Sequence, residues 1–226
     1  GPCMSFVKDS FFMKGCSLSC WWCHNPESRS AEIMTYPKQE KIGGHLIESE
    51  ETIGRYMTTQ EVVNEVMKDS MLYEESGGGV TISGGEPFYQ SRFLLKLLKS
   101  LKKKELHACV DTTGQVDKGT LVKAARHTDL FLFDLKHFDD RMHIKYTGVS
   151  NKLILDNLVL LDKLNKAVEI RYPLVPGIND DEADLYRMFA FLQKLQNKYP
   201  VTILPYHKIG SNKYRRFNIA YKMEGV

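Results

Sequence analysis

A chain of 226 residues and 26.0 kDa, with 42% hydrophobic and 26% charged residues, is typical of a globular protein with one sizeable core. Its net charge of +3 is too small to favour a nucleic-acid partner, and no apolar run is long enough to predict a membrane-spanning helix. Three of its five cysteines fall between Cys16 and Cys23, a distribution typical of a metal site in a reducing compartment and not of a disulfide framework. We therefore expect a monomer in the cytoplasm, with no nucleic-acid or membrane partner.

The chain opens with Gly1-Pro2-Cys3, which leaves two interpretations open: a trimmed chain, or a native start at Met4. A first strand is predicted over Phe6–Met13, and the clustered cysteines come directly after it. Residues 27–57 are polar, contain no cysteine and show no clear periodicity. We expect them to form a long excursion between the first two strands.

Helices and strands then alternate to the end of the chain. The predicted helices run from Thr58 to about Ser70, over Phe93–Leu101, over Leu153–Leu164 after the cap Asn151, and from Asp180 to about Lys198. The further strands are Val80–Ser83, His107–Asp111, Leu130–Leu135, Val168–Tyr172 and Val201–Pro205. This alternation predicts an α/β protein with a parallel sheet, and we expect residues 1–226 to form a single domain.

A polar motif follows each predicted strand. The motifs are GCSLSCWWCHNP at 15–26, SGGEP at 83–87, DTTG at 111–114, DLK at 134–136, RYPLVPG at 171–177 and PYH at 205–207. The carboxyl ends of parallel strands meet at one edge of a sheet, where barrels and open α/β sheets build their active sites. The sequence therefore predicts one functional site assembled from these loops.

The clustered cysteines, Cys16, Cys20 and Cys23, are candidate metal ligands. A cubane iron–sulfur cluster has four irons, so three cysteines leave one iron open to bind a substrate or cofactor. A structural zinc ion needs a fourth ligand, and the adjacent His24 is too close along the chain to supply it comfortably. We favour the iron–sulfur cluster, with a zinc site or an unligated loop as alternatives. Cys109 lies inside a predicted strand and is expected to be a buried core residue.

The order and spacing of these motifs resemble a known family. CxxxCxxC with an aromatic residue before the last cysteine, followed by Gly-Gly-Glu after the next strand, resembles the radical S-adenosylmethionine superfamily. The motifs together are similar to those of the glycyl-radical-enzyme activating enzymes, and the similarity covers nearly the whole chain. It implies a partial (β/α)6 barrel of parallel strands, open on one side, with the cofactor at its carboxyl mouth.

The resemblance also implies roles for individual residues. Cys16, Cys20 and Cys23 are expected to hold a single 4Fe-4S cluster whose open iron binds S-adenosylmethionine. The residues expected to contact that cofactor are Trp22, Cys23, His24, Gly84, Gly85, Glu86, Asp111, Asp134, Leu135, Lys136, Arg171 and His207. Of these, Glu86 is expected to pair with the methionine ammonium group. Asp111 and Asp134 are expected to lie beside the cofactor and to help hold a monovalent cation.

The implied reaction begins when a flavodoxin or ferredoxin reduces the cluster. S-adenosylmethionine is then cleaved to a 5′-deoxyadenosyl radical, which removes hydrogen from a backbone glycine of a partner glycyl radical enzyme. One alternative is a radical enzyme with another substrate, such as the activator of anaerobic ribonucleotide reductase, but the RYPLVPG and PYH motifs favour the first interpretation. The other alternative is a metal-bearing interaction module without catalysis.

The sequence departs from the family pattern at both ends and in the excursion. Cys3 stands where the family has the last glycine of an Asp-Gly-Pro-Gly element, and the chain stops at Val226, where relatives usually continue into a last helix. We therefore expect truncated ends. Members with auxiliary clusters carry further cysteines in the region of residues 27–57, so we expect no auxiliary cluster in this chain.

Overall fold

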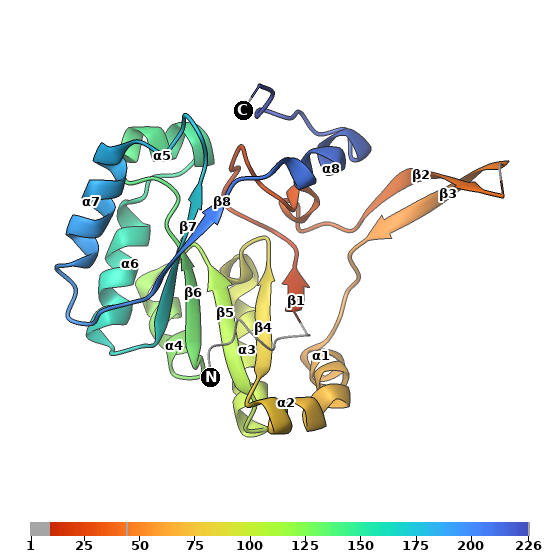
Figure 1. Cartoon of the computed structure of the whole chain (residues 1–226). Coiled ribbons are helices and arrows are strands. Elements are labelled where there is room, and N and C mark those ends of the chain that lie inside the picture. The colour runs from red at the N-terminus through yellow and green to blue at the C-terminus, as the bar shows by residue number, and fades with distance from the viewer. Residues whose placement is uncertain (1–9, 44, 226) are drawn as a thin grey trace.

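The computed structural model describes residues 10–43 and 45–225, so Cys3 and the predicted strand residues before Ser10 lie outside the described part of the chain. The described residues form a six-stranded sheet in the order β1-β4-β5-β6-β7-β8 (Figure 1). The strands are β1 Ser10–Met13, β4 Gly79–Gly84, β5 His107–Thr112, β6 Leu130–Asp134, β7 Val168–Leu174 and β8 Val201–Pro205. Every neighbouring pair runs parallel. The predicted parallel α/β sheet is confirmed, and β1 and β8 form its two edges, so the described sheet is open and not a closed barrel.

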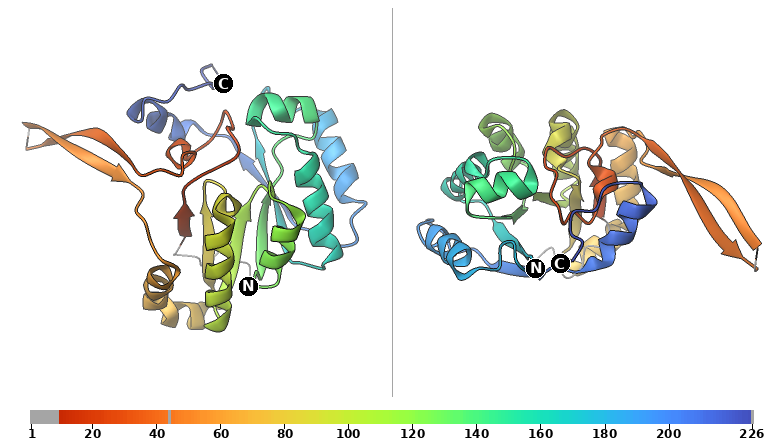
Figure 2. Two further views of the ribbon diagram at one scale, coloured as in Figure 1. Left: turned by 180° about the vertical axis from the view of Figure 1, so that it is seen from behind. Right: turned by 90° about the horizontal axis from the view of Figure 1, so that it is seen from above.

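Helices cover one face of this sheet. They are α1 Thr59–Val66, α2 Ser70–Ser76, α3 Ser91–Lys103, α4 Lys118–Ala125, α5 Asp140–Thr147, α6 Lys152–Lys163 and α7 Glu182–Leu192. The last helix, α8 Ser211–Arg216, lies apart from this layer, beside the turn Pro26–Ser28. Figures 1 and 2 show α3, α4, α6 and α7 side by side along the sheet. This arrangement buries residues of β4, β5, β6 and β7, whereas every residue of β8 is partly or fully exposed.

The main hydrophobic core lies between the sheet and these helices. The predicted apolar stripe of α3 is confirmed, because Leu94, Leu97, Leu98 and Leu101 are 0% exposed and Phe93 packs against them partly buried. Alternate residues of the strands face them, such as Phe131 and Phe133 of β6, both 0% exposed. Cys109 is also fully buried, as predicted, but it lies in a separate small cluster with Leu132.

The predicted start of the first helix is confirmed in detail. Glu61 and Thr58 form a capping box, with Thr58 N donating to Glu61 Oε2 at 2.7 Å and Glu61 N to Thr58 Oγ1 at 3.2 Å. The helix is shorter than predicted: α1 ends at Val66, and a 3-10 turn over Met67–Asp69 leads into α2.

Two other helix starts need correction. Asn151 precedes α6 as predicted, but its side chain makes no cap and instead donates to Phe138 O at 2.9 Å. The last predicted helix begins at Glu182 instead of Asp180, with Asp181 as its cap, and ends at Leu192. The helices α4 and α5 were not predicted, although each begins with a capping aspartate, Asp117 or Asp139.

The predicted excursion after the cysteine loop contains a β-hairpin, which was not predicted. Strands β2 Met34–Ile42 and β3 His45–Ile53 pair antiparallel and project away from the sheet (Figures 1 and 2). The base of the hairpin is anchored, where the ring of Tyr36 packs on Phe217 with centroids 4.5 Å apart and Glu51 pairs with Arg216. A strand pair whose two faces both meet water needs no alternation of polar and apolar residues, which explains why no strand was predicted in this segment.

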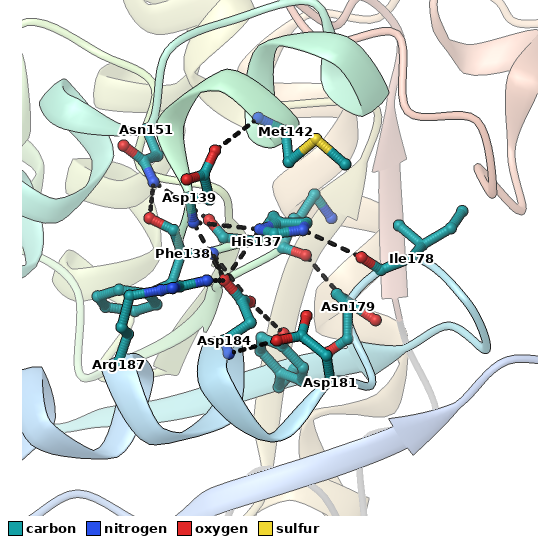
Figure 3. A network of polar contacts seen from close by, with 12 residues as sticks. His137, Phe138, Asp139, Met142, Asn151, Ile178, Asn179, Asp181, Asp184 and Arg187 are labelled. Atoms are coloured by element: carbon teal, nitrogen blue, oxygen red, sulfur yellow. Dashed lines mark hydrogen bonds and ion pairs between the residues drawn. The ribbon is translucent and has the colours of Figure 1, made fainter.

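A buried carboxylate connects the loops after β6 and β7 (Figure 3). Asp184 of α7 is 0% exposed and accepts hydrogen bonds from Phe138 N at 3.0 Å, Asp139 N at 3.1 Å and the hydroxyl of Tyr172 at 2.8 Å. The ring of His137 lies 3.0 Å from the same carboxylate. This network holds the segment that follows the predicted DLK motif against the end of β7.

Candidate functional site

The cysteine loop follows β1 and is held by main-chain hydrogen bonds at both of its ends. Cys16 N donates to Arg29 O at 3.0 Å, while Ser19 N donates to Thr147 O at 2.7 Å. The predicted ligand Cys20 is buried, whereas Cys16 and Cys23 are half-buried, and all three are free thiols. The loop therefore presents three cysteines from a fixed backbone.

The surroundings of the thiols fit a positively charged metal group. Burial raises the pKa of Cys16 to about 11 and that of Cys20 to about 12, which favours the neutral thiol at both positions. The thiolate is the form that binds metal, and a bound iron–sulfur cluster supplies the positive charge that stabilises it. Leu18 N already donates a hydrogen bond to Cys16 Sγ at 3.4 Å.

The three cysteines do not converge on a single ion. Within residues 10–43 and 45–225, no three His, Cys, Asp or Glu side chains lie close enough together to hold one metal ion. A cubane cluster does not require such convergence, because each cysteine binds a different iron.

The SGGEP loop is joined directly to the cysteine loop. Gly85 N donates to Met13 O and Glu86 N donates to Gly15 O, both at 2.8 Å. A Cβ atom on Gly84, where φ is +116°, would lie 2.2 Å from Met13 O, and one on Gly85 would lie 2.3 Å from Gly15 O. These glycines are required because the two loops touch, a reason additional to the predicted approach of a cofactor.

The side chain of Glu86 points into the protein. It is 1% exposed, and its two oxygens accept hydrogen bonds from Phe88 N, from the hydroxyl of Thr112 and from both N and Oγ1 of Thr113, at 2.7–3.2 Å. Burial nevertheless raises its pKa. The carboxylate of Glu86 therefore binds the DTTG loop. Its pairing with the methionine ammonium group stays a prediction.

The charged residues of the next three motifs meet at the carboxyl edge of the sheet, as predicted. Arg171 donates from Nε to Asp134 Oδ1 at 2.8 Å and from Nη2 to Asp111 Oδ1. Lys136 Nζ donates to the other oxygen of Asp134 at 3.0 Å, and Ser83 donates to Asp111 Oδ2 at 2.6 Å. The four charged side chains are only 12–19% exposed. Two carboxylates and two cations are thus balanced in a largely desolvated group.

The ionisation of this group depends on its cations. Burial alone would raise the pKa of Asp134, but Arg171 and Lys136 outweigh it and lower that pKa. Burial and the charge of Asp134 raise the pKa of Asp111. Against the effect of burial, Asp134 raises the pKa of both Lys136 and Arg171. The two basic groups stay charged, and Asp134 is the carboxylate that they hold ionised.

Two predicted cofactor contacts have buried side chains. Leu135 is 3% exposed and packs in the main core, while its main-chain N donates to Arg171 O at 2.9 Å at the sheet edge. Trp22 is 6% exposed and packs near Tyr146 beneath the cysteine loop. Its Nε1 is buried without a hydrogen-bond partner among the described residues, which fits a site completed by a bound group.

His24 and His207 come together although they are far apart in the chain. Their rings stack with centroids 4.4 Å apart and an angle of 29° between the planes. His24 follows the last cysteine, and His207 follows β8 and is exposed. Burial, and then the neighbouring His207, lower the pKa of His24. The stack joins the first and last loops of the predicted site.

The residues that hold the main chain of the site's loops in place were not predicted from the sequence. Asn179 donates through Nδ2 to Lys136 O at 2.8 Å and to Pro173 O at 2.7 Å, which ties the DLK and RYPLVPG loops together. Tyr214 and Arg29 contact the main chain of the cysteine loop. Asn179 stands two residues after the Pro-Gly of its motif, where a polar residue is only a weak signal. The contact of Tyr214 joins segments 191 residues apart and that of Arg29 spans nine residues, and no local pattern indicates either.

Comparison with known proteins identifies the family. The family model of the radical SAM superfamily, where SAM is S-adenosylmethionine, matches residues 10–189. The chain belongs to the radical SAM superfamily. The pyruvate formate-lyase-activating enzyme of Staphylococcus epidermidis is 37% identical over 100% of this chain and 84% of that protein, and the Staphylococcus aureus enzyme of the same name is 36% identical over the same shares. Within the superfamily, the chain therefore belongs with the activating enzymes, as the motifs predicted.

Solved structures agree with this radical SAM assignment. A domain of a pyruvate-formate lyase-activating enzyme from Bacteroides vulgatus has a TM-score of 0.54 and 36% identity, covering 57% of this chain and 81% of that one. Streptococcus suis SuiB bound to precursor peptide SuiA has a TM-score of 0.66 at 14% identity, covering 94% of this chain and 41% of that one, which supports the fold alone. Membership in the superfamily implies a 4Fe-4S cluster and SAM as cofactors, in agreement with the predictions. It does not favour the zinc or non-catalytic alternatives.

Proposed function

We propose that this chain activates a glycyl radical enzyme by removing a hydrogen atom from a backbone glycine of that partner. The observation that carries the proposal is the assembly of three free thiols, Cys16, Cys20 and Cys23, on a loop bonded directly to the SGGEP loop. The family of its relatives, named as pyruvate formate-lyase-activating enzymes, supports it. When bound, the cluster and SAM supply the one-electron cleavage and the hydrogen abstraction.

The residues of the chain then bind, orient and shield these groups. In this proposal Cys16, Cys20 and Cys23 hold the cluster. The cofactor is bound by the main chain at Gly84 and Gly85, by the indole N–H of Trp22, by His24 and His207, and by the charged group of Asp111, Asp134, Lys136 and Arg171. The charged group offers both signs of charge in a partly desolvated place, which suits the carboxylate and ammonium of an amino acid.

Other parts of the proposal concern partners and setting. We propose that residues 1–226 act as a single domain and as a monomer, and that a flavodoxin or ferredoxin supplies the electron. The reducing conditions that keep free cysteines and an iron–sulfur cluster intact support a cytoplasmic location. As a separate finding, no helix in the described residues is long and apolar enough to cross a membrane.

The predicted monovalent cation is not needed to balance the carboxylates. Arg171 lies between Asp111 and Asp134, and Lys136 provides a second positive charge. The proposal therefore uses these protein cations in place of a bound ion beside the two aspartates.

The first experiment tests the cluster. Anaerobic reconstitution with iron and sulfide is expected to give about four irons per chain, the content of one cubane. Replacing Cys16, Cys20 or Cys23 by alanine should abolish it, whereas Cys109→Ala, a buried cysteine outside the loop, should retain it. Equal iron content in all four variants would contradict the assignment of the ligands.

The second experiment tests the reaction. The reconstituted enzyme is mixed with SAM, a reductant and pyruvate formate-lyase as the probe partner, and a persistent glycyl radical is expected in the electron paramagnetic resonance spectrum. Deuterium placed only at the target glycine should appear in 5′-deoxyadenosine. If deuterium arrives instead from a small molecule with no protein partner present, the chain is a radical enzyme for another substrate.

A further inference from the structure

The carboxyl-terminal helix α8 lies beside the cysteine loop (Figure 1). Tyr214 of α8 is 2% exposed, and its hydroxyl donates to Cys23 O at 2.8 Å and lies 3.4 Å from Trp21 O. The donor and the acceptor are 191 residues apart in the chain. A side chain from the end of the described structure thus binds the main chain of a candidate cluster ligand at its beginning.

A second side chain reaches the same loop from its other side. The guanidinium of Arg29 donates to Cys20 O, and its Nη2 also lies 3.4 Å from the hydroxyl of Tyr214. The main-chain oxygens of two of the three cysteines, Cys20 and Cys23, are therefore held by one connected pair of side chains. The third cysteine, Cys16, is held instead through its N–H, which donates to Arg29 O at 3.0 Å.

Further contacts fix α8 in place against the loop. Lys213 Nζ donates to Asn25 Oδ1 and to Glu27 Oε1, both at 2.7 Å, in the turn just after the cysteines. The ring of Tyr214 also lies 5.8 Å from the guanidinium carbon of Arg29. The contacts of Lys213 and of the Tyr214 ring therefore help to position the Tyr214 hydroxyl, in addition to its own hydrogen bond to Cys23 O.

We propose that Tyr214 and Arg29 are positioning residues that set the stability and the reduction potential of the cluster. The inference rests on the proposed function, because it takes Cys16, Cys20 and Cys23 as the ligands. Tyr214 acts through the hydrogen bond that fixes the Cys23 carbonyl. Arg29 acts through its hydrogen bond to the Cys20 carbonyl and through its positive charge, which favours the more negative, reduced state of a cluster nearby.

Two pairs of variants separate the hydrogen bonds from the charge. Tyr214→Phe keeps the ring and removes only the hydroxyl. Its matched control is Tyr221→Phe, because the hydroxyl of Tyr221 bonds to that of Tyr206 and not to the cysteine loop. Arg29→Lys keeps the positive charge but loses the guanidinium, whose Nη2 serves both Cys20 O and the hydroxyl of Tyr214, and Arg29→Met loses both charge and donor.

Two properties of the reconstituted protein are measured: the rate at which an iron chelator removes the cluster, and the midpoint potential of the cluster. Tyr214→Phe should lose its cluster about two- to tenfold faster than the wild type, the effect expected for one hydrogen bond, and Tyr221→Phe should not. Arg29→Met should lower the midpoint potential, and Arg29→Lys should restore the potential without restoring the slow loss of cluster.

The possible outcomes are distinguishable. If the wild type binds no cluster, the proposed function fails. If the wild type binds a cluster but Tyr214→Phe and Arg29→Met match it in both rate and potential, only this inference is overturned. The unfolding temperature of the metal-free proteins is compared as well. If a variant unfolds at a lower temperature but keeps the wild-type midpoint potential and rate of cluster loss, the inference is also overturned. The two residues are then only structural.

Discussion

Thr113 donates two hydrogen bonds to one carboxylate oxygen of Glu86, from its main-chain N at 2.8 Å and from its hydroxyl at 2.7 Å. This pair joins the loop after β4 to the loop after β5 inside the protein. The Gly-Gly-Glu motif therefore has a structural role, because its acidic residue fixes the relative position of two loops of the site. Gly84 and Gly85, which precede it, let the same loop pack closely against Met13 and Gly15 at the start of the cysteine loop.

The first prediction concerns this carboxylate. In Glu86→Gln, one acceptor oxygen becomes an NH2 group that faces a donor, so the free energy of unfolding should fall by about 1–3 kcal/mol. Chemical denaturation of the metal-free protein measures the change. Glu65→Gln makes the same substitution on a side chain that is 58% exposed, and it should be nearly neutral. A neutral Glu86→Gln would show that the four hydrogen bonds contribute little.

The second prediction concerns the charged group at the sheet edge. Asp134→Ala should weaken SAM binding about ten- to a hundredfold, the effect of losing about 1.5–3 kcal/mol from one charged hydrogen-bond partner, while the iron content stays the same. Asp129→Ala removes a carboxylate beside the opposite end of β6, where it accepts from Ala108 N at 2.9 Å, and should leave the affinity unchanged. Equilibrium binding to the reconstituted protein measures both. Equal affinities in the two variants would remove Asp134 from the site.

The third prediction concerns pH and Asp184. Burial would raise the pKa of Asp184, but His137, Phe138 N and Tyr172 outweigh it and hold that pKa well below its ordinary value of 3.8. Since the folded state binds the proton less well than the unfolded state, this carboxylate stabilises the fold above about pH 4, and its contribution is lost as the pH falls below that value. The wild type should therefore lose stability on acidification more steeply than Asp184→Asn.

At neutral pH the same variant should be less stable than the wild type by about 1–3 kcal/mol, because its amide group leaves buried donors without an acceptor. Asp181→Asn is the matched control, since asparagine caps a helix as well as aspartate does and the residue caps the same helix. Urea denaturation between pH 3 and pH 7 compares the three proteins. Parallel pH profiles for the wild type and Asp184→Asn would refute the assignment.

The fourth prediction concerns the β-hairpin. The strands pair Pro37 with Glu50, so residues 38–49 can be replaced by an Asn-Gly turn while Tyr36 and Glu51 keep their contacts at the base. Because an isolated two-stranded ribbon adds little stability, the shortened protein should unfold within about 1 kcal/mol of the wild type and bind the same amount of iron. Denaturation and iron analysis measure the two properties. A large loss of either would show that the outer hairpin supports the fold.

The sequence predicted the sheet and the place of the site well, for a physical reason. Strands buried by helices read as short apolar runs, and the polar residues that end them are conspicuous against that background, as Asp134 is after Leu130–Phe133. The same logic failed for the hairpin, which is exposed and carries no such contrast. Helices α4 and α5 were missed because each has only eight residues and a weak apolar pattern.

The directions of individual side chains could not be predicted in the same way. Position in a motif placed Glu86 and Leu135 at the right edge of the sheet, but their side chains turn inward to Thr113 and to the core. Contacts between distant segments were also invisible, as between Tyr214 and the cysteine loop. Such contacts depend on how the whole chain closes, and no local pattern of residue types encodes them.

The order of the strands has a consequence for how the protein is made. Each strand of the sheet lies next to the one synthesised before it, so the sheet can grow along one edge as the chain emerges. The hydrogen bond from Tyr214 to Cys23 is different, because 191 residues separate its partners and their synthesis takes about 10–40 s at about 5–20 residues per second. The cysteine loop is synthesised early, and its hydrogen bond to Tyr214 can form only near the end of synthesis. A nascent chain therefore presents its cysteines well before the helix that secures them exists.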